Sequence, residues 1–479
     1  MTTSLEAHPG SPRMPHDRIL MLVPHEPCLD PRIQWVTSLC RAIGPTDILG
    51  AVPSRPADKP AREYDGRVYL ERVQHSEAAS AAAQSIPFFF ENSRYSSAAM
   101  RRYTESESRR RSCLREAAPP DLAQPSGPQS AWIGKIDHQV GAICRFLSAW
   151  GSYGVVTSAL YRRGRAVSIR PRVIVCHDMF ALAAGLKLKK LFGCPVLYDS
   201  HEFWPEADLL APAWQQRLVS WLERKLIRRA DVVITVTPYL ARHMERRYGI
   251  RDVVSVPNAA PRPAPDTGIE CRPISPPIRF LFQGQAARGR GIEHLLETWR
   301  MVDSNVAVLA LRCPENEFVA SLRVRYQELI EQRKVVMLPA VGESDLISAA
   351  RTADVGIIPY GGSNLNHEMG CPNKLSQYMQ AGLAILASKT AFVADVLERY
   401  GCGRTYEAGM PASIREIIQA WSHKPAALQT MKTKALEAVE SEFNWESQSV
   451  QYSTAIRELW NREDSVTGRA AERKATDRA

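Results

Sequence analysis

Short apolar runs that alternate with amphipathic stretches constrain the fold of this chain more than any other feature. Residues 18–23 (RILMLV) predict a buried strand, and Ile33, Val36 and Cys40 then recur at helical spacing. Parallel strands need crossover helices, so this alternation predicts parallel sheets with helices on both faces. We expect further strands near residues 46–51, 68–72, 172–176, 195–199, 231–236 and 252–256.

A proline-rich stretch at residues 258–277 interrupts this alternation and has the composition of a linker. Strands are predicted again after it, near residues 278–283, 306–312, 335–338, 354–359 and 384–388. The chain therefore predicts an α/β protein with two doubly wound, Rossmann-like domains, at residues 18–257 and 278–443. Ligands of such sheets bind at the carboxyl ends of strands, so we expect the site in a cleft between the domains.

Four segments fall outside the two predicted domains. Residues 1–17 are interpreted as a disordered leader, 462–479 as a disordered tail, and 444–461 as a closing helix. Residues 94–130 hold seven arginines between Arg94 and Arg115, followed by a Pro/Ser/Gln-rich run. This segment is either a mobile, solvated insertion or a patch that touches anionic lipid.

Charge and composition narrow the class of protein. The chain of 479 residues carries a formal net charge of +10, but its aromatic residues are not interleaved with the basic ones, so no nucleic acid is expected as a partner. Its 10 cysteines show no metal-ligand spacing, which indicates reduced thiols in a cytoplasmic protein. The uncharged residues 146–161, flanked by arginines, are either a buried helix or a peripheral attachment to the inner face of the cytoplasmic membrane.

The stretch FLFQGQAARGRGIEHLLETW, residues 280–299, is the first candidate for a ligand site. A predicted strand enters a glycine-rich turn at Gly284, and a helix leaves at Gly291. The free backbone N–H groups of such a turn, with Arg288 and Arg290 beside them, suit a phosphate. The alternative is an ordinary turn with solvated arginines.

The stretch CPNKLSQYMQAGLAILAS, residues 371–388, is the second candidate. Pro372 suits the first turn of a helix, and Asn373 can cap its backbone donors. Lys374 is a cation at the positive end of the helix dipole, which is unfavourable unless an anion binds there. The alternative is a solvated lysine whose stem packs on Leu375. Together with the glycine-rich turn, this helix suits a diphosphate.

Three further groups follow predicted strands in the first domain. His201 and Glu202 come after the strand that ends at Asp199, and His177 and Asp178 end the preceding strand in the same way. A histidine there can hydrogen-bond a ligand or transfer a proton, although a structural histidine is the alternative. Asp178 is equally explained as a helix cap. After the first strand, Asp30 is expected to cap a helix.

Arg32 lies in the first turn of that same helix, where its charge opposes the dipole, which suggests an anion or an acidic partner.

Four motifs in this order resemble the retaining, nucleotide-sugar-dependent glycosyltransferases of family 4. They are DPRI at 30–33, YDSHEFWPE at 198–206, FQGQAARGRGIEHLL at 282–296, and the stretch at 371–388. The resemblance spans most of residues 18–461 and implies the GT-B fold. It also implies that the C-terminal domain binds the nucleotide sugar, the N-terminal domain binds the acceptor, and the last helix crosses back to the N-terminal domain.

The resemblance assigns roles to individual residues. In the family's glycine-rich turn, Gly284 and Gly291 match the glycines, Arg290 matches a lysine, and Gln285 stands where arginine is usual. His201 matches the histidine that faces the donor hexose. Met369 and Gln377 stand at the positions of the family's first and second glutamates, and Glu368 is adjacent to Met369. The predicted catalytic residues are His201, Arg290, Lys374 and Glu368; the donor-binding residues Gly284, Gln285, Arg288, Gly291, Asn373, Leu375 and Gln377; the acceptor-side residues Arg32, His177, Asp178 and Glu202.

The function implied by this resemblance is transfer of a hexose from a nucleotide diphosphate sugar to a saccharide or lipid-linked saccharide. No metal and no cofactor are expected, because lysine and arginine can supply the positive charge at the diphosphate. Two alternatives stay open. One is a sugar-nucleotide 2-epimerase, and the other is a degenerate protein that binds a sugar nucleotide without turnover, as Gln285, Gln377 and Met369 would allow.

Overall fold

The computed structural model describes residues 18–25, 30–53, 68–73, 151, 153–167, 169–207, 212–263, 272–361 and 364–462. The predicted leader (1–17) and the arginine-rich insertion (94–130) lie outside these residues, as do the tail after residue 462 and the middle of the proline-rich segment.

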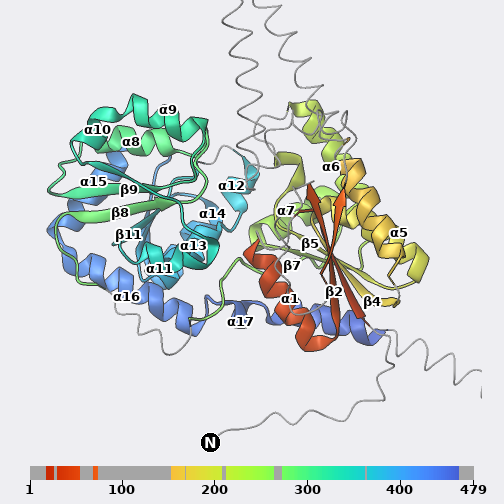
Figure 1. The fold of residues 1–479 in the computed structure, drawn as a ribbon. Helices are drawn as coiled ribbons and strands as arrows, with labels where there is room; N and C mark the ends of the chain where they lie inside the picture. The colour runs from red at the N-terminus through yellow and green to blue at the C-terminus, as the bar shows by residue number, and fades with distance from the viewer. Residues whose placement is uncertain are drawn as a thin grey trace, which may run out of the picture.

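The N-terminal half contains a seven-stranded parallel sheet in the order β3-β2-β1-β4-β5-β6-β7 (Figure 1). The order reverses between β1 and β4, so the carboxyl ends of these strands flank a topological switch point. The strands are β1 (Arg18–Val23), β2 (Thr46–Pro53), β3 (Val68–Val73), β4 (Pro171–His177), β5 (Val196–Ser200), β6 (Val232–Thr235) and β7 (Val254–Ser255).

Both faces of this sheet are buried, because its residues alternate between two apolar clusters. Ile19 and Met21 pack with α1 (Pro31–Ile43), whereas Leu20 and Leu22 pack with α5 (Asp178–Phe192) and α7 (Pro238–Tyr248). Helix α6 (Ala213–Ile227) lies beside α5 (Figure 1). The continuous apolar strands seen in the sequence are therefore the strands of a doubly covered parallel sheet.

The C-terminal half contains a six-stranded parallel sheet in the order β10-β9-β8-β11-β12-β13. Its strands are β8 (Ile278–Gln283), β9 (Ala307–Arg312), β10 (Val335–Leu338), β11 (Val355–Ile358), β12 (Ala384–Ser388) and β13 (Gly403–Tyr406). Strand β13 was not predicted, because its sequence GRTY is partly exposed at the sheet edge and has no apolar run. The prediction of two doubly wound sheets is confirmed.

Helices surround the second sheet as its crossover connections require. They are α8 (Ile292–Arg300), α9 (Glu317–Arg325), α10 (Gln327–Glu331), α11 (Leu346–Ala350), α12 (Leu365–Met369), α13 (Asn373–Gln380), α14 (Ala391–Tyr400), α15 (Pro411–His423) and α16 (Pro425–Ser441). Two short 3-10 helices, η2 (Trp204–Glu206) and η4 (Glu343–Asp345), lie in loops.

The chain crosses back to the N-terminal half after α16, as predicted, but in two helices rather than one. Helix α17 (Trp445–Gln448), capped by Asn444, ends at Ser449, and a second helix covers residues 450–462. Tyr452 and Ile456 are both 0% exposed, in the apolar cluster that also holds Ile33 of α1. In Figure 1 these last helices lie next to α1, although the two segments are near opposite ends of the sequence.

The uncharged segment at 146–161 is a core helix in the part that the structure describes, which includes residues 153–165. Ala159 and Leu160 are each 2% exposed, and Tyr153 stacks on Phe180 of α5 with ring centroids 3.3 Å apart. Ala159 and Leu160 thus face the core, as the interpretation of a buried helix predicts, whereas Gly154 and Ser158 are exposed, and the alternative of a peripheral attachment stays a prediction. Among the described helices none is both long and apolar enough to cross a membrane.

The crossover predicts a stability test within one helix. Ile456→Ala should destabilise the protein by about 2–5 kcal/mol, because it opens a cavity between the helix and the sheet of the other half. Glu458→Ala, two residues along and exposed, is the matched control and should have little effect. Urea unfolding of both variants measures this. Equal midpoints would show that the closing helix does not hold the N-terminal core.

Candidate functional site

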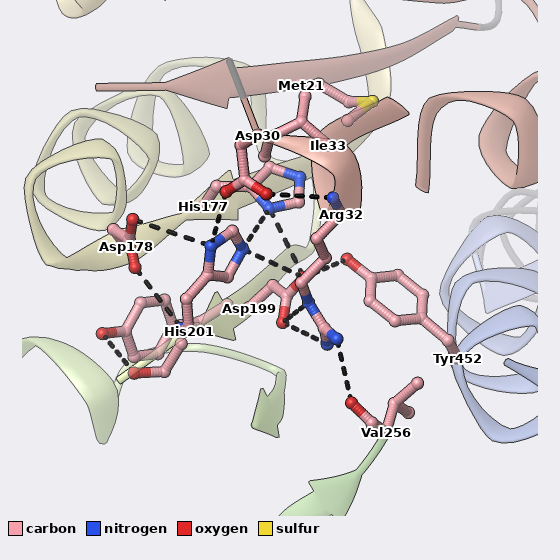
Figure 2. Close-up of polar contacts among 12 residues, drawn as sticks. Met21, Asp30, Arg32, Ile33, His177, Asp178, Asp199, His201, Val256 and Tyr452 are labelled. Carbon is pink, nitrogen blue, oxygen red and sulfur yellow. Dashed lines mark hydrogen bonds and ion pairs between the residues drawn. The ribbon is translucent and has the colours of Figure 1, made fainter. Parts of the chain in front are cut away.

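Arg32 and Asp199 form a buried ion pair where α1 begins and β5 ends (Figure 2). Arg32 Nη2 lies 2.9 Å from Asp199 Oδ1 and Nε lies 3.0 Å from Oδ2. Nη1 donates to the carbonyl of Val256 at 2.9 Å and to Asn258 Oδ1 at 3.0 Å. The acidic partner suggested for Arg32 is therefore part of the chain itself. Arg32 is 1% exposed, so the interpretation that it contacts the acceptor is corrected to a supporting role.

His201 lies among three carboxylates beside this ion pair (Figure 2). Its Nδ1 is 3.0 Å from Asp30 Oδ2 and 4.0 Å from Asp178 Oδ2, and its Nε2 is 3.6 Å from Asp199 Oδ2. Burial alone would lower the pKa of His201, but the negative charges of Asp178 and Asp30 and the bonds to Asp199 and Asp30 raise it well above 6.5. His201 is therefore an imidazolium that donates hydrogen bonds.

His177 behaves in the opposite way. It is 0% exposed, and its Nδ1 lies 3.1 Å from His201 Nε2. Burial lowers its pKa, and the bond to Asp199 only partly offsets this, so a neutral His177 stands next to a charged His201. Asp30 caps α1 as predicted, by accepting from the backbone N–H of Arg32 at 2.9 Å, and in addition it binds His201.

Asp178 does not cap α5, contrary to one of its two interpretations. The N-cap is His177, and Asp178 is the first helical residue, with φ at +66°. A left-handed conformation costs a residue with a Cβ about 1–2 kcal/mol, and such strain persists where surrounding contacts enforce it. The contact here is between the Asp178 carboxylate and the backbone N–H of His201, at 3.4 Å.

His177, Asp199 and His201 bring their ligand atoms within 4.8 Å of one another, which is close enough for a metal ion. Both carboxylate oxygens of Asp199, however, already accept from Arg32, and Oδ2 also accepts from Tyr452 at 3.2 Å. A guanidinium at this carboxylate competes with a cation, so the donor set fits a hydrogen-bonded network better than a metal centre.

The glycine-rich turn and the N-terminus of α13 come together in the second half. Gly284 has φ at +116°, and a Cβ there would lie 2.9 Å from Lys374 Nζ. Gly291, with φ at +78°, is the N-cap of α8, and a Cβ there would clash with the carbonyl oxygen of Pro359. The turn therefore needs glycine at both positions, and the Lys374 amino group lies directly against it.

Tyr360, two residues after β11, contacts both Lys374 and Arg290. The sequence analysis did not predict it as a site residue. Lys374 Nζ donates to its hydroxyl at 2.5 Å, and Arg290 Cζ lies 5.9 Å from its ring centroid. Burial raises the pKa of Tyr360, but the charges of Lys374 and Arg290 outweigh this, so the net shift is downward. The signal available in the sequence was its place at the carboxyl end of a buried strand, next to two glycines.

His367, on α12, was missed as well. Its ring stacks on Tyr360 with centroids 5.1 Å apart. Burial and the charge of Arg290 lower its pKa to about 4, so it is neutral at pH 7.

The remaining residues predicted to bind the donor substrate differ in how far their side chains are exposed. Leu375 is 0% exposed and belongs to the core, so its side chain is not available to a donor. Asn373 is the first residue of α13 behind Pro372 and does not cap it, which corrects that expectation. Arg288 is exposed over the ring of Phe318. Gln285 offers its carbonyl to Arg290 at 3.3 Å. Gln377 lies half-buried on α13.

Helix α12 connects the second half to the loop after β5. Asn366 donates to the carbonyl of Phe203 at 3.0 Å and accepts from its N–H at 2.6 Å. The Glu206 carboxylate accepts from the N–H of Leu365 at 2.7 Å. Glu368 lies on this helix, and its carboxylate makes no hydrogen bond or ion pair with the residues that the structure describes.

Glu202, in the loop held by α12, links the two groups of residues. Burial and the negative charge of Asp178 raise its pKa to about 7, and the charges of His201 and Arg290 lower it in part. The positive charge of Arg290 thus lowers the pKa of a carboxyl group that belongs to the other half of the protein. The carboxyl ends of both sheets face one another here, with His201 and Glu202 on one side and Arg290, Tyr360 and Lys374 on the other.

Comparisons with known proteins agree with this arrangement. Residues 61–259 match the family described as "Glycosyl transferase 4-like domain". Sucrose-phosphate synthase from Thermosynechococcus elongatus matches with a TM-score of 0.62 and 16% identity, over 93% of this chain and 99% of that one. HepE from Anabaena, solved in complex with UDP and glucose, matches with a TM-score of 0.59 and 12% identity, over 92% and 99%.

An α,α-trehalose-phosphate synthase (UDP-forming) from Burkholderia vietnamiensis also matches, with a TM-score of 0.56 and 14% identity, over 92% and 99% of the two chains. No curated protein sequence matches significantly.

The two facing Rossmann-like sheets with a helix that crosses back are the GT-B fold of nucleotide-sugar glycosyltransferases. Residues 61–259, in the first half of the chain, are similar to the glycosyl transferase 4-like domain of that class.

The charge state of His201 predicts a pH dependence of stability. Because its folded pKa is raised above 6.5, its stabilising contribution is complete below that pH and is lost as pH rises through the folded pKa. His201→Gln should therefore lower the unfolding midpoint most near pH 6 and progressively less toward alkaline pH. His294→Gln, at an exposed position, is the control. A His201→Gln deficit that does not change with pH would contradict a charged His201.

Proposed function

We propose that this glycosyltransferase moves a hexose, with retention of configuration, from a nucleotide diphosphate sugar to a saccharide or lipid-linked saccharide acceptor in glycan synthesis. The observation that carries the proposal is the meeting of Lys374 and Arg290 at Tyr360. Within the described residues neither cation has a carboxylate in contact, and each lies at a helix N-terminus, of α13 and α8. A site with this much uncompensated positive charge suits a diphosphate.

The chemistry follows from the same geometry. Lys374 Nζ donates to the Tyr360 hydroxyl, and a phosphate oxygen can replace that hydroxyl as the acceptor. The N–H of Gly284 already donates to the carbonyl of Arg312 at 2.9 Å, so the donors that remain for a phosphate are the side chains of Lys374 and Arg290 and the N-terminus of α13. As the sugar–phosphate bond breaks, negative charge grows on the leaving diphosphate, and these fixed donors stabilise it.

His201 and Glu202 are assigned to the sugar side of the site. A protonated His201 cannot take up a proton at neutral pH, so we assign it as a hydrogen-bond donor to a hydroxyl of the donor hexose. His177 and Asp178 hold it in place, which makes them positioning residues. Glu202, with its pKa raised to about 7, is assigned to an acceptor hydroxyl. Glu368 and Gln377 are proposed to bind hydroxyls of the donor.

Two features of the solved relatives support a hexose donor. The HepE structure contains UDP and glucose, and two other matches are named for the synthesis of sugar phosphates. Nucleotide release measured with and without a saccharide acceptor tests the proposal. Release that needs an acceptor supports transfer, an altered sugar nucleotide without release indicates an epimerase, and binding without turnover indicates a degenerate protein.

Lys374→Ala should weaken nucleotide diphosphate binding by about 10–100-fold, because a charge-assisted bond worth about 1.5–3 kcal/mol is lost. Turnover should fall further, since charge builds on the leaving group. The stability of the free protein should change by no more than about 1 kcal/mol, because the lost bond to Tyr360 is offset by removal of a charge that opposes the helix dipole.

Titration calorimetry with UDP and GDP measures this loss of affinity. Lys334→Ala, before β10, is the control at the opposite edge of the same sheet and should bind as wild type does. If Lys374→Ala binds both nucleotides normally, the donor site lies elsewhere.

Transfer should also persist in EDTA, because Lys374 and Arg290 supply the positive charge that a divalent cation would otherwise supply. The initial rate of nucleotide release, measured with EDTA and with added manganese, checks this. A rate that collapses on chelation and recovers with manganese would overturn the metal-independent mechanism.

A further inference from the structure

Glu223, on α6, places a carboxyl group inside the N-terminal half without a cation to balance it. The residue is 0% exposed, and within the described part of the chain its contacts are the hydroxyls of two tyrosines, Tyr198 and Tyr248. Burial and the negative charges of Asp178 and Glu202 raise the pKa of Glu223 to about 8, although the two tyrosine hydroxyls lower it in part. A charged carboxylate without a cation is costly to bury, so the neutral acid prevails at pH 7.

The contacts of Glu223 continue to the loop that carries the candidate site. The hydroxyl of Tyr198 lies 2.9 Å from Glu223 Oε1 and 3.1 Å from Ser200 Oγ. Ser200 Oγ in turn donates to the carbonyl oxygen of Glu202 at 2.9 Å. Tyr198 and Ser200 both lie on β5 and are 0% exposed. We call this series of contacts from Glu223 to Glu202 the hydroxyl chain; it connects α6 to the backbone beside His201.

A count of protons distinguishes the two charge states of Glu223. In the neutral acid, the carboxyl O–H can donate to Tyr198 and the Tyr198 O–H to Ser200. The Ser200 proton is then available for the carbonyl of Glu202, so each contact of the hydroxyl chain has one proton. An ionised Glu223 can only accept, so Tyr198 must donate to it. The single proton of Ser200 is then shared between Tyr198 and Glu202, and one contact is lost.

We propose that Glu223 is a positioning residue that fixes the loop of His201 and Glu202 through the hydroxyl chain. The inference rests on the proposed transfer reaction, in which these two residues contact the sugar and the acceptor. Thr235, on β6, donates to the carbonyl of Ser200 at 3.0 Å, so the start of the loop is also held from the neighbouring strand. Small displacements of groups that orient a substrate slow a reaction strongly, which is why a buried support can affect turnover.

The groups that face Glu223 come from four parts of the fold. They are Tyr198 on β5, Tyr248 on α7, Asp178 at the start of α5, and Glu202 in the loop. The cation nearest along α7, Arg247, donates through Nε to Ser220 Oγ at 3.0 Å rather than to Glu223. The surrounding charges are thus negative, and they favour the same neutral form that the hydroxyl chain requires.

Two matched tyrosine variants test the role of the hydroxyl chain. Tyr198→Phe and Tyr248→Phe each remove one buried hydroxyl that contacts Glu223, but only Tyr198 lies between Glu223 and the loop. Tyr198→Phe should lower kcat for acceptor-dependent nucleotide release by about tenfold or more and leave the affinity for UDP or GDP within about twofold. Tyr248→Phe keeps its ring against Phe203 and should keep kcat near that of wild type.

Both tyrosine variants lose a buried hydrogen bond, so their thermal unfolding midpoints should fall to a similar extent. If kcat falls equally in the two variants, or in neither, Glu223 has only a structural role and the inference is wrong.

The pH dependence of kcat supplies a second test, with Glu223→Gln as the conservative variant. The amide N–H can donate to Tyr198 at every pH, as the acid O–H does only below its pKa. Wild-type kcat should therefore decline as pH rises through about 8, where Glu223 ionises, whereas Glu223→Gln should keep the rate at pH 7 and lack this part of the decline. Loss of the His201 proton affects both proteins alike. Glu223→Leu should be slow at every pH. A Glu223→Gln variant as slow as Glu223→Leu would overturn the proposal.

The position of His201 can also be followed without turnover. In protein labelled with ¹³C at histidine Cε1, the His201 signal is the one that His201→Gln removes. This signal should shift in Tyr198→Phe and stay in place in Tyr248→Phe and in Glu223→Gln. An unmoved signal in Tyr198→Phe contradicts the inference whatever the activity. If the signal moves as expected but no saccharide acceptor stimulates nucleotide release by wild type, the loop is positioned as inferred and the proposed transfer reaction is wrong.

Discussion

The buried ion pair between Arg32 and Asp199 holds together the part of the structure on which the site depends. It joins the start of α1, the end of β5, the end of β7 through Val256, and the helix at residues 450–462 through Tyr452. Burying two charges costs several kcal/mol for each ion unless geometry and further bonds compensate, and here every side of the Asp199 carboxylate has a partner. This arrangement also fixes the space in which His177 and His201 lie.

The charges of the two halves of the site are compensated to different extents. In the first half, Asp30, Asp178 and Asp199 surround His201, and the two cations His201 and Arg32 compensate most of the charge of these three carboxylates. In the second half, Lys374 and Arg290 approach Tyr360, and no carboxylate of the described residues is in contact with either cation. A cluster whose charges largely compensate one another fixes the geometry of its residues. A cluster with uncompensated positive charge attracts an anion. The proposed division into a sugar side and a diphosphate side rests on this difference.

Much of the fold was predictable because its signals are local. The apolar runs of β1, β8 and β12, the glycines of the turn before α8, and the proline-rich segment each act over a few residues. Strand β13 escaped prediction since an edge strand needs little apolar surface. Of the candidate site, Lys374 was predicted from a charge placed against a helix dipole, and Arg290 from its place beside the glycine-rich turn. Tyr360 and His367 were not found, because only their contacts distinguish them from ordinary aromatic residues.

The sequence by itself determined which elements form, their order, and the set of polar residues at the strand ends, because hydrophobic period, turn chemistry and capping are properties of neighbouring residues. The tertiary structure decided which charges are paired. Arg32 and Lys374 look alike in the sequence, each a cation in the first turn of a helix, yet one is closed off by Asp199, 167 positions along the chain, and the other is left with a tyrosine. Electrostatic partners act through space, so only the folded chain could separate a structural cation from one available to a ligand.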